Sequence, residues 1–254
     1  MRSTRFVIDI SLSSAKSEAL PQGKETKMLA QKIIDTVSGY TPLEDFDSTA
    51  SANTSFDDID AVAKTINAVR ILCSSQAQKQ LKLDVSSFII ILDSDSKRTI
   101  DEGSGLGLVR EIAESARAVA PAHACSSVLA GHASESDEYA DVGLLLSAGS
   151  VEINPEDGVE KKAQAVLSSL GLDSLHSSKM MPLAISSETR APVTFKASAQ
   201  DADVQRLSSL LAKLSHNFAF SVSAEDVVLH FLLGRLPESG AWAGLLGVGI
   251  WSDA

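Results

Sequence analysis

Apolar residues in this chain fall into two kinds of segment, which alternate along the sequence. Short runs such as 88–92 (FIIIL) are apolar at every position, which is typical of strands buried on both faces. Longer segments such as 108–119 (LVREIAESARAV) repeat apolar residues every three or four positions, which predicts amphipathic helices. Because the two kinds of segment alternate, the pattern predicts an α/β fold.

The same pattern gives the expected order of elements. It predicts strands at 5–12, 88–92, 139–148, 191–197, 218–222 and 244–251. It predicts helices at 24–37, 57–81, 108–119, 125–133, 158–170, 200–214 and 224–233. Residues 41–56 are acidic and rich in Ser and Thr, so we expect a loop there. Helices on both faces of the sheet would give a layered α/β/α arrangement with a mostly parallel or mixed sheet.

Composition narrows the classes of function. The chain has 254 residues, 44% of them apolar, which is enough for a sizeable hydrophobic core. A net charge of −11 gives no general attraction for nucleic acid or for anionic membranes. Since no run of 18 apolar residues occurs, we expect no membrane span. Two cysteines make no disulfide framework, so we expect thiols and a soluble intracellular protein, with cytoplasm, peroxisome and mitochondrion left undistinguished.

Candidate chemistry is concentrated in residues 122–155, which contain Cys125 followed by Ser126 and Ser127. The predicted helix 125–133 would place Cys125 at a helix N-terminus, where free N–H groups and the positive helix end favour a thiolate. The same N–H groups would stabilise an oxyanion on an acyl substrate. The alternative is that Cys125 is a small buried apolar side chain without a chemical role.

Two blocks of the chain resemble the thiolase family. The first block, residues 109–156, reads REIAESARAVAP, then AHACSSVLAGHA, then YADVGLLLSAGSVE. The second block, residues 179–205, reads KMMPLAISSETRAPVTFKASAQDADVQ. It retains residues that resemble the thiolase pattern: Met181, Pro182, Ile185, Ser187, Glu188, Ser198 and Asp201.

The resemblance implies a thiolase-like fold and a site. It implies an α/β domain over residues 1–175 with the nucleophile loop, followed by a shortened C-terminal α/β segment over residues 176–254. It implies that Cys125 accepts an acyl group from acyl-CoA or another acyl-thioester, with Ser126, Met181 and Gly149 lining the substrate site. It also implies an acyltransferase of lipid metabolism that forms oligomers and uses no metal and no cofactor besides the coenzyme A thioester.

The chain also departs from the thiolase pattern. Val128 and Ala184 stand where thiolases have glycine, and Ala148 precedes Gly149 where a glycine pair is expected. No cysteine follows Cys125, and Arg235 stands where the activating histidine would be. A second hypothesis is therefore a non-catalytic thiolase-like protein that acts by homo- or hetero-oligomeric association, with the apolar residues 240–251 covering a dimer face.

Other motifs are weaker. Asp93-Ser94-Asp95 follows a predicted strand and would suit a divalent metal, but a turn at the strand end explains it as well. Gln22-Gly23-Lys24 lacks the first glycine and the hydroxyl residue of a phosphate loop, so a helix start is the simpler interpretation. His123 and His132 flank Cys125, and either would be a candidate base for its thiol.

Overall fold

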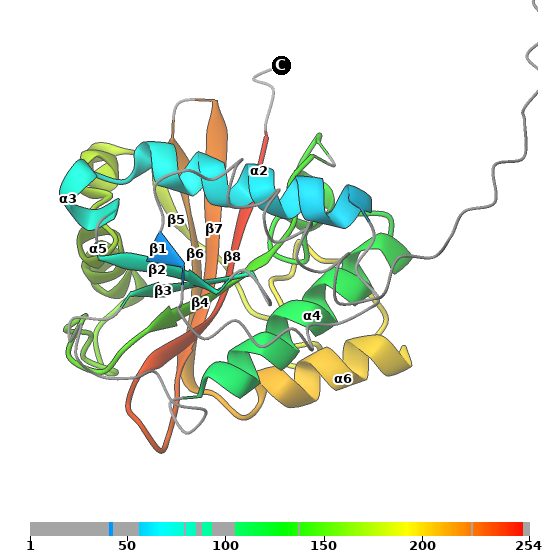
Figure 1. Ribbon diagram of the computed structural model, residues 1–254. Coiled ribbons are helices and arrows are strands. Elements are labelled where there is room, and N and C mark those ends of the chain that lie inside the picture. The colour runs from blue at the N-terminus through cyan, green and yellow to red at the C-terminus, as the bar shows by residue number, and fades with distance from the viewer. Residues whose placement is uncertain are drawn as a thin grey trace, which may run out of the picture.

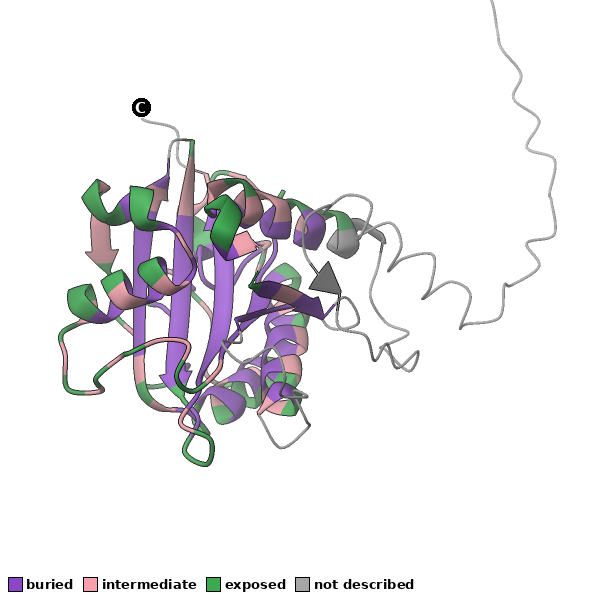
Figure 2. Ribbon diagram, turned by 60° about the vertical axis from the view of Figure 1, so that its left-hand side comes forward, coloured by how far each residue is buried: buried purple, intermediate pink, exposed green. Residues whose placement is uncertain are grey.

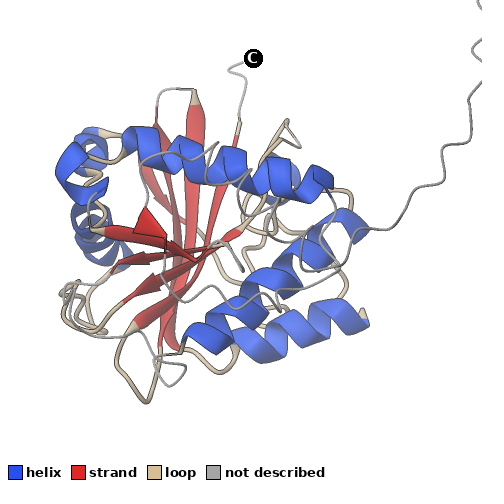
Figure 3. Ribbon diagram, viewed as in Figure 1, coloured by secondary structure: helices blue, strands red, loops and turns tan. Residues whose placement is uncertain are grey.

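A single mixed β-sheet with helices on both faces forms the body of the protein (Figures 1 and 3). The computed structural model describes residues 41–42, 56–78, 80–84, 88–92, 105–136, 138–224 and 226–250. The strand order is β1-β2-β3-β4-β8-β7-β6-β5. These strands are β1 (Thr41–Pro42), β2 (Leu81–Asp84), β3 (Ile89–Leu92), β4 (Val142–Leu146), β5 (Met180–Pro182), β6 (Ser215–Ala224), β7 (Val227–Arg235) and β8 (Trp242–Gly249).

Most neighbouring strands in this sheet run in opposite directions. Only β1 with β2 and β3 with β4 are parallel among the described strands. The β6–β7–β8 meander is antiparallel, and β8 returns to pair with β4 in the middle of the sheet. Strands from both sides of the boundary expected between residues 175 and 176 therefore belong to one sheet.

Two layers of helix cover the sheet. The helices are α2 (Phe56–Leu72), α3 (Ser75–Gln78), α4 (Leu106–Ala122), α5 (Val159–Ser169) and α6 (Ala202–Leu211), with 3₁₀ turns η2 (Gly131–Ala133) and η3 (Asp173–Ser177). Helices α2 and α5 pack on one face, whereas α4 and α6 lie side by side on the other (Figure 1). The result is a layered α/β/α arrangement.

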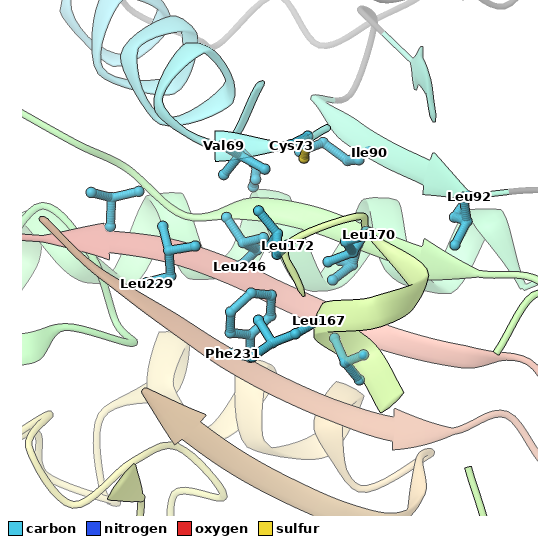
Figure 4. Close-up of a cluster of buried hydrophobic side chains, with 14 of the residues drawn as sticks. Val69, Cys73, Ile90, Leu92, Leu167, Leu170, Leu172, Leu229, Phe231 and Leu246 are labelled. Carbon is cyan, nitrogen blue, oxygen red and sulfur yellow. The ribbon is translucent and has the colours of Figure 1, made fainter. Parts of the chain in front are cut away.

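Each face of the sheet has its own hydrophobic core, and the strands are buried along most of their length (Figure 2). On one face, Val69 of α2 and Leu167 of α5 pack with Ile90, Phe231 and Leu246 of the strands (Figure 4). The opposite face packs against the apolar stripe of α4, whose buried residues recur at helical spacing. Because alternate residues of β3, β4 and β8 enter opposite cores, these strands need apolar residues at every position.

The structure confirms the α/β class and several elements. The predicted helices at 108–119, 158–170 and 200–214 correspond to α4, α5 and α6. The predicted strands at 88–92, 139–148, 218–222 and 244–251 correspond to β3, β4, β6 and β8. The apolar segment 240–251 contains the buried strand β8, so burial inside the sheet explains its composition without a dimer face.

The structure differs from the three predicted elements at 57–81, 191–197 and 224–233. Residues 224–233 form strand β7, because an apolar run buried on both faces has no period that separates strand from helix. Residues 191–197 form turns with one bridge, between Ile185 and Pro192. The predicted helix 57–81 is divided into α2, α3 and β2. The described sheet is mixed, which is the second of the two arrangements expected, because the β6–β7–β8 meander is antiparallel.

Some predictions lie outside the described residues. They are the strand at 5–12, the helix at 24–37, most of the loop at 41–56, and the motifs at 22–24 and 93–95.

Candidate functional site

Cys125 lies just beyond the C-terminal end of α4, and the predicted helix 125–133 is absent. After α4 the chain forms a turn and then only the short 3₁₀ turn η2. The Cys125 side chain is 7% exposed, and its Sγ–H donates to Ala120 O at 3.4 Å. The predicted position of Cys125 at a helix N-terminus is therefore wrong. The nearby helix end is the negative one, which disfavours a thiolate.

Ser126 is half-buried, and the serine after it makes the more extensive contacts. Ser127 Oγ donates to Asp141 Oδ1 at 2.6 Å and accepts from the N–H groups of Leu129 and Ala130. Its carbonyl accepts from Gly131 N–H at 2.9 Å. Ser127 thus begins the single tight turn that follows Cys125 and anchors it to Asp141, which lies directly before β4.

Asp141 is a buried carboxylate that holds this turn in place. It is 1% exposed, and its Oδ2 accepts the N–H of Val128 at 2.6 Å. Burial raises the pKa of Asp141 to about 6, while the hydrogen bonds from Ser127 and Val128 and the charge of Arg117 oppose that rise. Asp141 was not among the residues expected at the site, because a single acid at the edge of an apolar strand resembles a surface residue. Its position directly before a fully apolar run was the available signal.

Asp141 stands at one end of a row of residues that crosses the sheet. Val142 pairs with Leu246, so Asp141 lies beside Gly247 in the continuing register. Gly247 pairs with His230, His230 with Ser221, and Ser221 with Met181. Directly opposed residues of neighbouring strands point to the same face. We call the five residues Asp141, Gly247, His230, Ser221 and Met181 the cross-strand row.

Two glycines of β8 let polar side chains lie against the sheet. A Cβ at Gly247 would stand 2.6 Å from Asp141 Oδ1 and 2.9 Å from Ser127 Oγ. A Cβ at Gly249 would stand 3.1 Å from His230 Nε2. A side chain at Gly247 would force a neighbour to shift, and one at Gly249 would make a tight contact, because the polar atoms fill the space that the side chain would occupy.

His230 is the least expected member of the row. It is 2% exposed, and neither of its ring nitrogens has a hydrogen-bond partner. Burial lowers the pKa of His230 to about 4, so the ring is neutral at pH 7. The space at Gly249 that faces His230 Nε2 is also bordered by Ala130 and Ser134. We call residues 127–134 the covering segment, because they close over this end of the row.

The two sequence blocks, residues 109–156 and 179–205, lie against each other. His132 N–H donates to Thr194 O at 3.3 Å, and a Cβ at Gly131 would meet the same carbonyl at 2.5 Å. The His123 ring packs edge-on against Phe195 at 5.4 Å, and His123 Nε2 lies 3.7 Å from Asp201 Oδ2. Contacts between residues 123–132 and 194–201 therefore join segments far apart in the sequence.

The predicted substrate-binding residues are not all brought together. Met181 is half-buried on the edge strand β5, at the far end of the cross-strand row from Asp141. Gly149 lies beyond the opposite end of β4, in a turn with φ of 89° and open space where a Cβ would stand. At about 3.3 Å per residue, β4 separates Gly149 from Asp141 and the turn after Cys125 by roughly 20 Å. Gly149 is explained by the turn that follows β4.

The remaining expectations for the site concern the histidine motif, metals and thiols. Arg235 ends β7 at an exposed position and pairs with Trp242, and the residues after it form the β7–β8 connection. Within the described part of the chain, no three His, Cys, Asp or Glu residues are grouped as a metal site would require. Cys73 and Cys125 are both thiols, as expected.

No helix in the described ranges is long and apolar enough to cross a membrane. The chain matches no protein-family model and no curated protein. The thiolase resemblance therefore stays a prediction from the residues of the two blocks.

Proposed function

We propose that this chain is a non-catalytic thiolase-like protein that acts by associating with a second copy of itself. The setting of Cys125 is the observation that carries the non-catalytic part. An acyl-accepting cysteine needs an accessible thiolate. Cys125 is instead buried at the negative end of α4, and its thiol donates a hydrogen bond to a backbone carbonyl.

The neighbouring polar groups do not form a relay that would activate a nucleophile. A nucleophile requires a base within hydrogen-bond reach, and that base requires a group that orients it. The Ser127 hydroxyl donates its hydrogen bond directly to Asp141, with no histidine between them. His230 makes no hydrogen bond. These three side chains are at most 2% exposed, so a substrate has no direct access to them.

The loop between β5 and α6 supports the association. Val193 in this loop is 56% exposed, and Arg190 and Lys196 beside it are exposed as well. Residues 179–213 contain five Lys or Arg and three Asp or Glu, a local charge of +2 in a chain of net charge −11. The excess positive charge comes from Lys179, Arg206 and Lys213, which flank the loop. An acidic face of a second copy would complement residues 179–213 as a whole, and such a contact would weaken with added salt.

Light scattering across a concentration series tests the association. We expect a dimer or larger oligomer at low salt, and a shift to monomer when Val193→Asp places a charge in the contact. Ile71→Asp is the matched control, because Ile71 is the other large exposed apolar residue among those that the structure describes, and it lies on α2, across the sheet. A monomer at every concentration, or equal disruption by Ile71→Asp, would refute the proposal.

Acyl transfer through Cys125 is the second candidate function, and the contact between the two thiolase-like blocks favours it. Intact-mass measurement after incubation with acetyl-CoA separates the two functions. Non-catalytic action predicts no acyl adduct on the native chain. An adduct that Cys125→Ser removes would establish the second candidate instead.

A further inference from the structure

The covering segment packs beside His230, a histidine whose ring makes no hydrogen bond. His230 lies on the central strand β7, with both ring nitrogens buried and without hydrogen bonds. Ala130 and Ser134 of the covering segment border the same space at Gly249 as His230 Nε2. A buried polar atom without a partner disfavours the closed state by about 1–3 kcal/mol, and a charged one by more.

We propose that the covering segment is a proton-released clamp: protonation of His230 opens residues 127–134 from the sheet, and Asp141 limits how far acid opens them. The neutral ring tolerates the dry contact, whereas an imidazolium needs water or an anion on each N–H. Opening the segment supplies that water. It breaks the hydrogen bond from Ile250 N–H, just beyond β8, to Ser134 Oγ, but it leaves the pairing of β7 with β6 and β8 in place.

Few charged groups around His230 are available to compensate for its protonation. On β7 itself the charged residue is Arg235, at the far end of the strand, and β8 has none. The neighbouring strand β6 contributes only His216, which is exposed near its start. The covering segment contributes the exposed His132. Asp141 belongs to the cross-strand row itself, and the Arg117 guanidinium donates to the backbone carbonyl of Asp141 at 3.5 Å. Asp141 is thus the one acidic group of these elements.

Asp141 opposes the effect of His230. Its buried carboxylate takes up a proton at higher pH than in the open state, which favours the closed segment in acid. Replacing Asp141 therefore leaves the effect of His230 on the opening equilibrium unopposed. From pH 7.5 to pH 5, the opening equilibrium should rise about 30-fold in Asp141→Asn but only about 3-fold in the unaltered chain.

Native-state hydrogen exchange measures this opening directly. The reporters are the amides of residues 128–131, which donate to Asp141 and to Ser127. Amides of Val166 and Leu167 in α5 serve as the reference for global unfolding, because these residues are buried in the opposite core. Exchange rates are corrected for the intrinsic pH dependence of free peptides.

We expect Asp141→Asn to lose about 30-fold of protection at residues 128–131 between pH 7.5 and pH 5, with these amides less protected than those of α5 at every pH, as an opening short of global unfolding requires. Adding His230→Gln should abolish this loss, whereas adding His132→Gln, an exposed histidine in the same segment, should not. Identical pH profiles with and without His230 would overturn the proposal.

Histidine ring NMR on the unaltered chain provides a test that needs no variant. The His230 ring should stay neutral down to about pH 4. Titration of His230 near 6.5, the ordinary value for a histidine, would overturn the proposal as well.

Discussion

Gly247 is the position where a single methyl group should do most damage to the site. Its missing side chain is what lets Asp141 and Ser127 approach β8, since a Cβ there would stand 2.6 Å from Asp141 Oδ1 and 2.9 Å from Ser127 Oγ. The carboxylate cannot simply turn away, because Ser127 and the Val128 N–H both hold it at 2.6 Å. Gly247→Ala must therefore displace the carboxylate or the strand.

The expected cost follows from the bonds that are disturbed. Overpacking a tight interior costs about 1–3 kcal/mol, and each hydrogen bond to a charged group contributes about 1.5–3 kcal/mol. Alanine recovers about 0.5–1 kcal/mol through its smaller loss of backbone freedom. We expect Gly247→Ala to lower the free energy of unfolding by about 3 kcal/mol.

Urea unfolding followed by circular dichroism measures this loss. Gly107→Ala is the matched control, because Gly107 is exposed in α4 and has nothing within 4 Å of its Cβ position. That control should change the free energy of unfolding by less than about 1 kcal/mol, in the stabilising direction. Asp141→Ala should remove most of the additional cost of Gly247→Ala, because the two sites share one contact. A loss below about 1 kcal/mol for Gly247→Ala would refute the argument.

Three further outcomes are expected. Because the pKa of His230 is lowered to about 4, its contribution to stability is lost as the pH falls from about 6.5 to 4. Because burial raises the pKa of Asp141 to about 6, its contribution to stability grows as the pH falls below about 6. In urea unfolding between pH 7 and pH 4, Asp141→Asn should therefore lose about 3 kcal/mol, whereas His230→Gln should gain about 2 kcal/mol; equal slopes would contradict this. Burial raises the pKa of Cys73 to about 12, so iodoacetamide at pH 8 should modify native Cys73 far more slowly than the unfolded chain. Asp201→Ala should destabilise by about 1 kcal/mol, because Asp201 caps α6 through the N–H groups of residues 203 and 204, and an unchanged midpoint would remove that role.

The α/β class was accessible from the sequence because it depends on local pattern. The apolar stripes of α4, α5 and α6 repeat at helical spacing, and the fully apolar runs at β3 and β4 are typical of strands covered on both sides. The same reasoning failed at β7, where a run apolar at nearly every position fits a helix as well as a strand. Only its pairing with β6 and β8 distinguishes the two.

The candidate site was less accessible, because its members meet through strand register. The sequence directed attention to Cys125 and the residues beside it, and it did so through an expected helix that the chain does not form. Asp141, Gly247 and His230 are separated by up to about a hundred positions in the chain, and no local spacing connects them.

The sequence by itself determined which segments are apolar enough to be buried, and therefore a layered α/β protein, together with its two cysteines and its net charge of −11. The tertiary structure decided what the chemistry-bearing residues contact. It placed Cys125 at the negative end of a helix, separated Gly149 from it by the length of β4, and aligned Asp141 with His230 across the glycine of β8. The physical reason is that burial is specified by each residue's own character, whereas register depends on how strands distant in the chain pair.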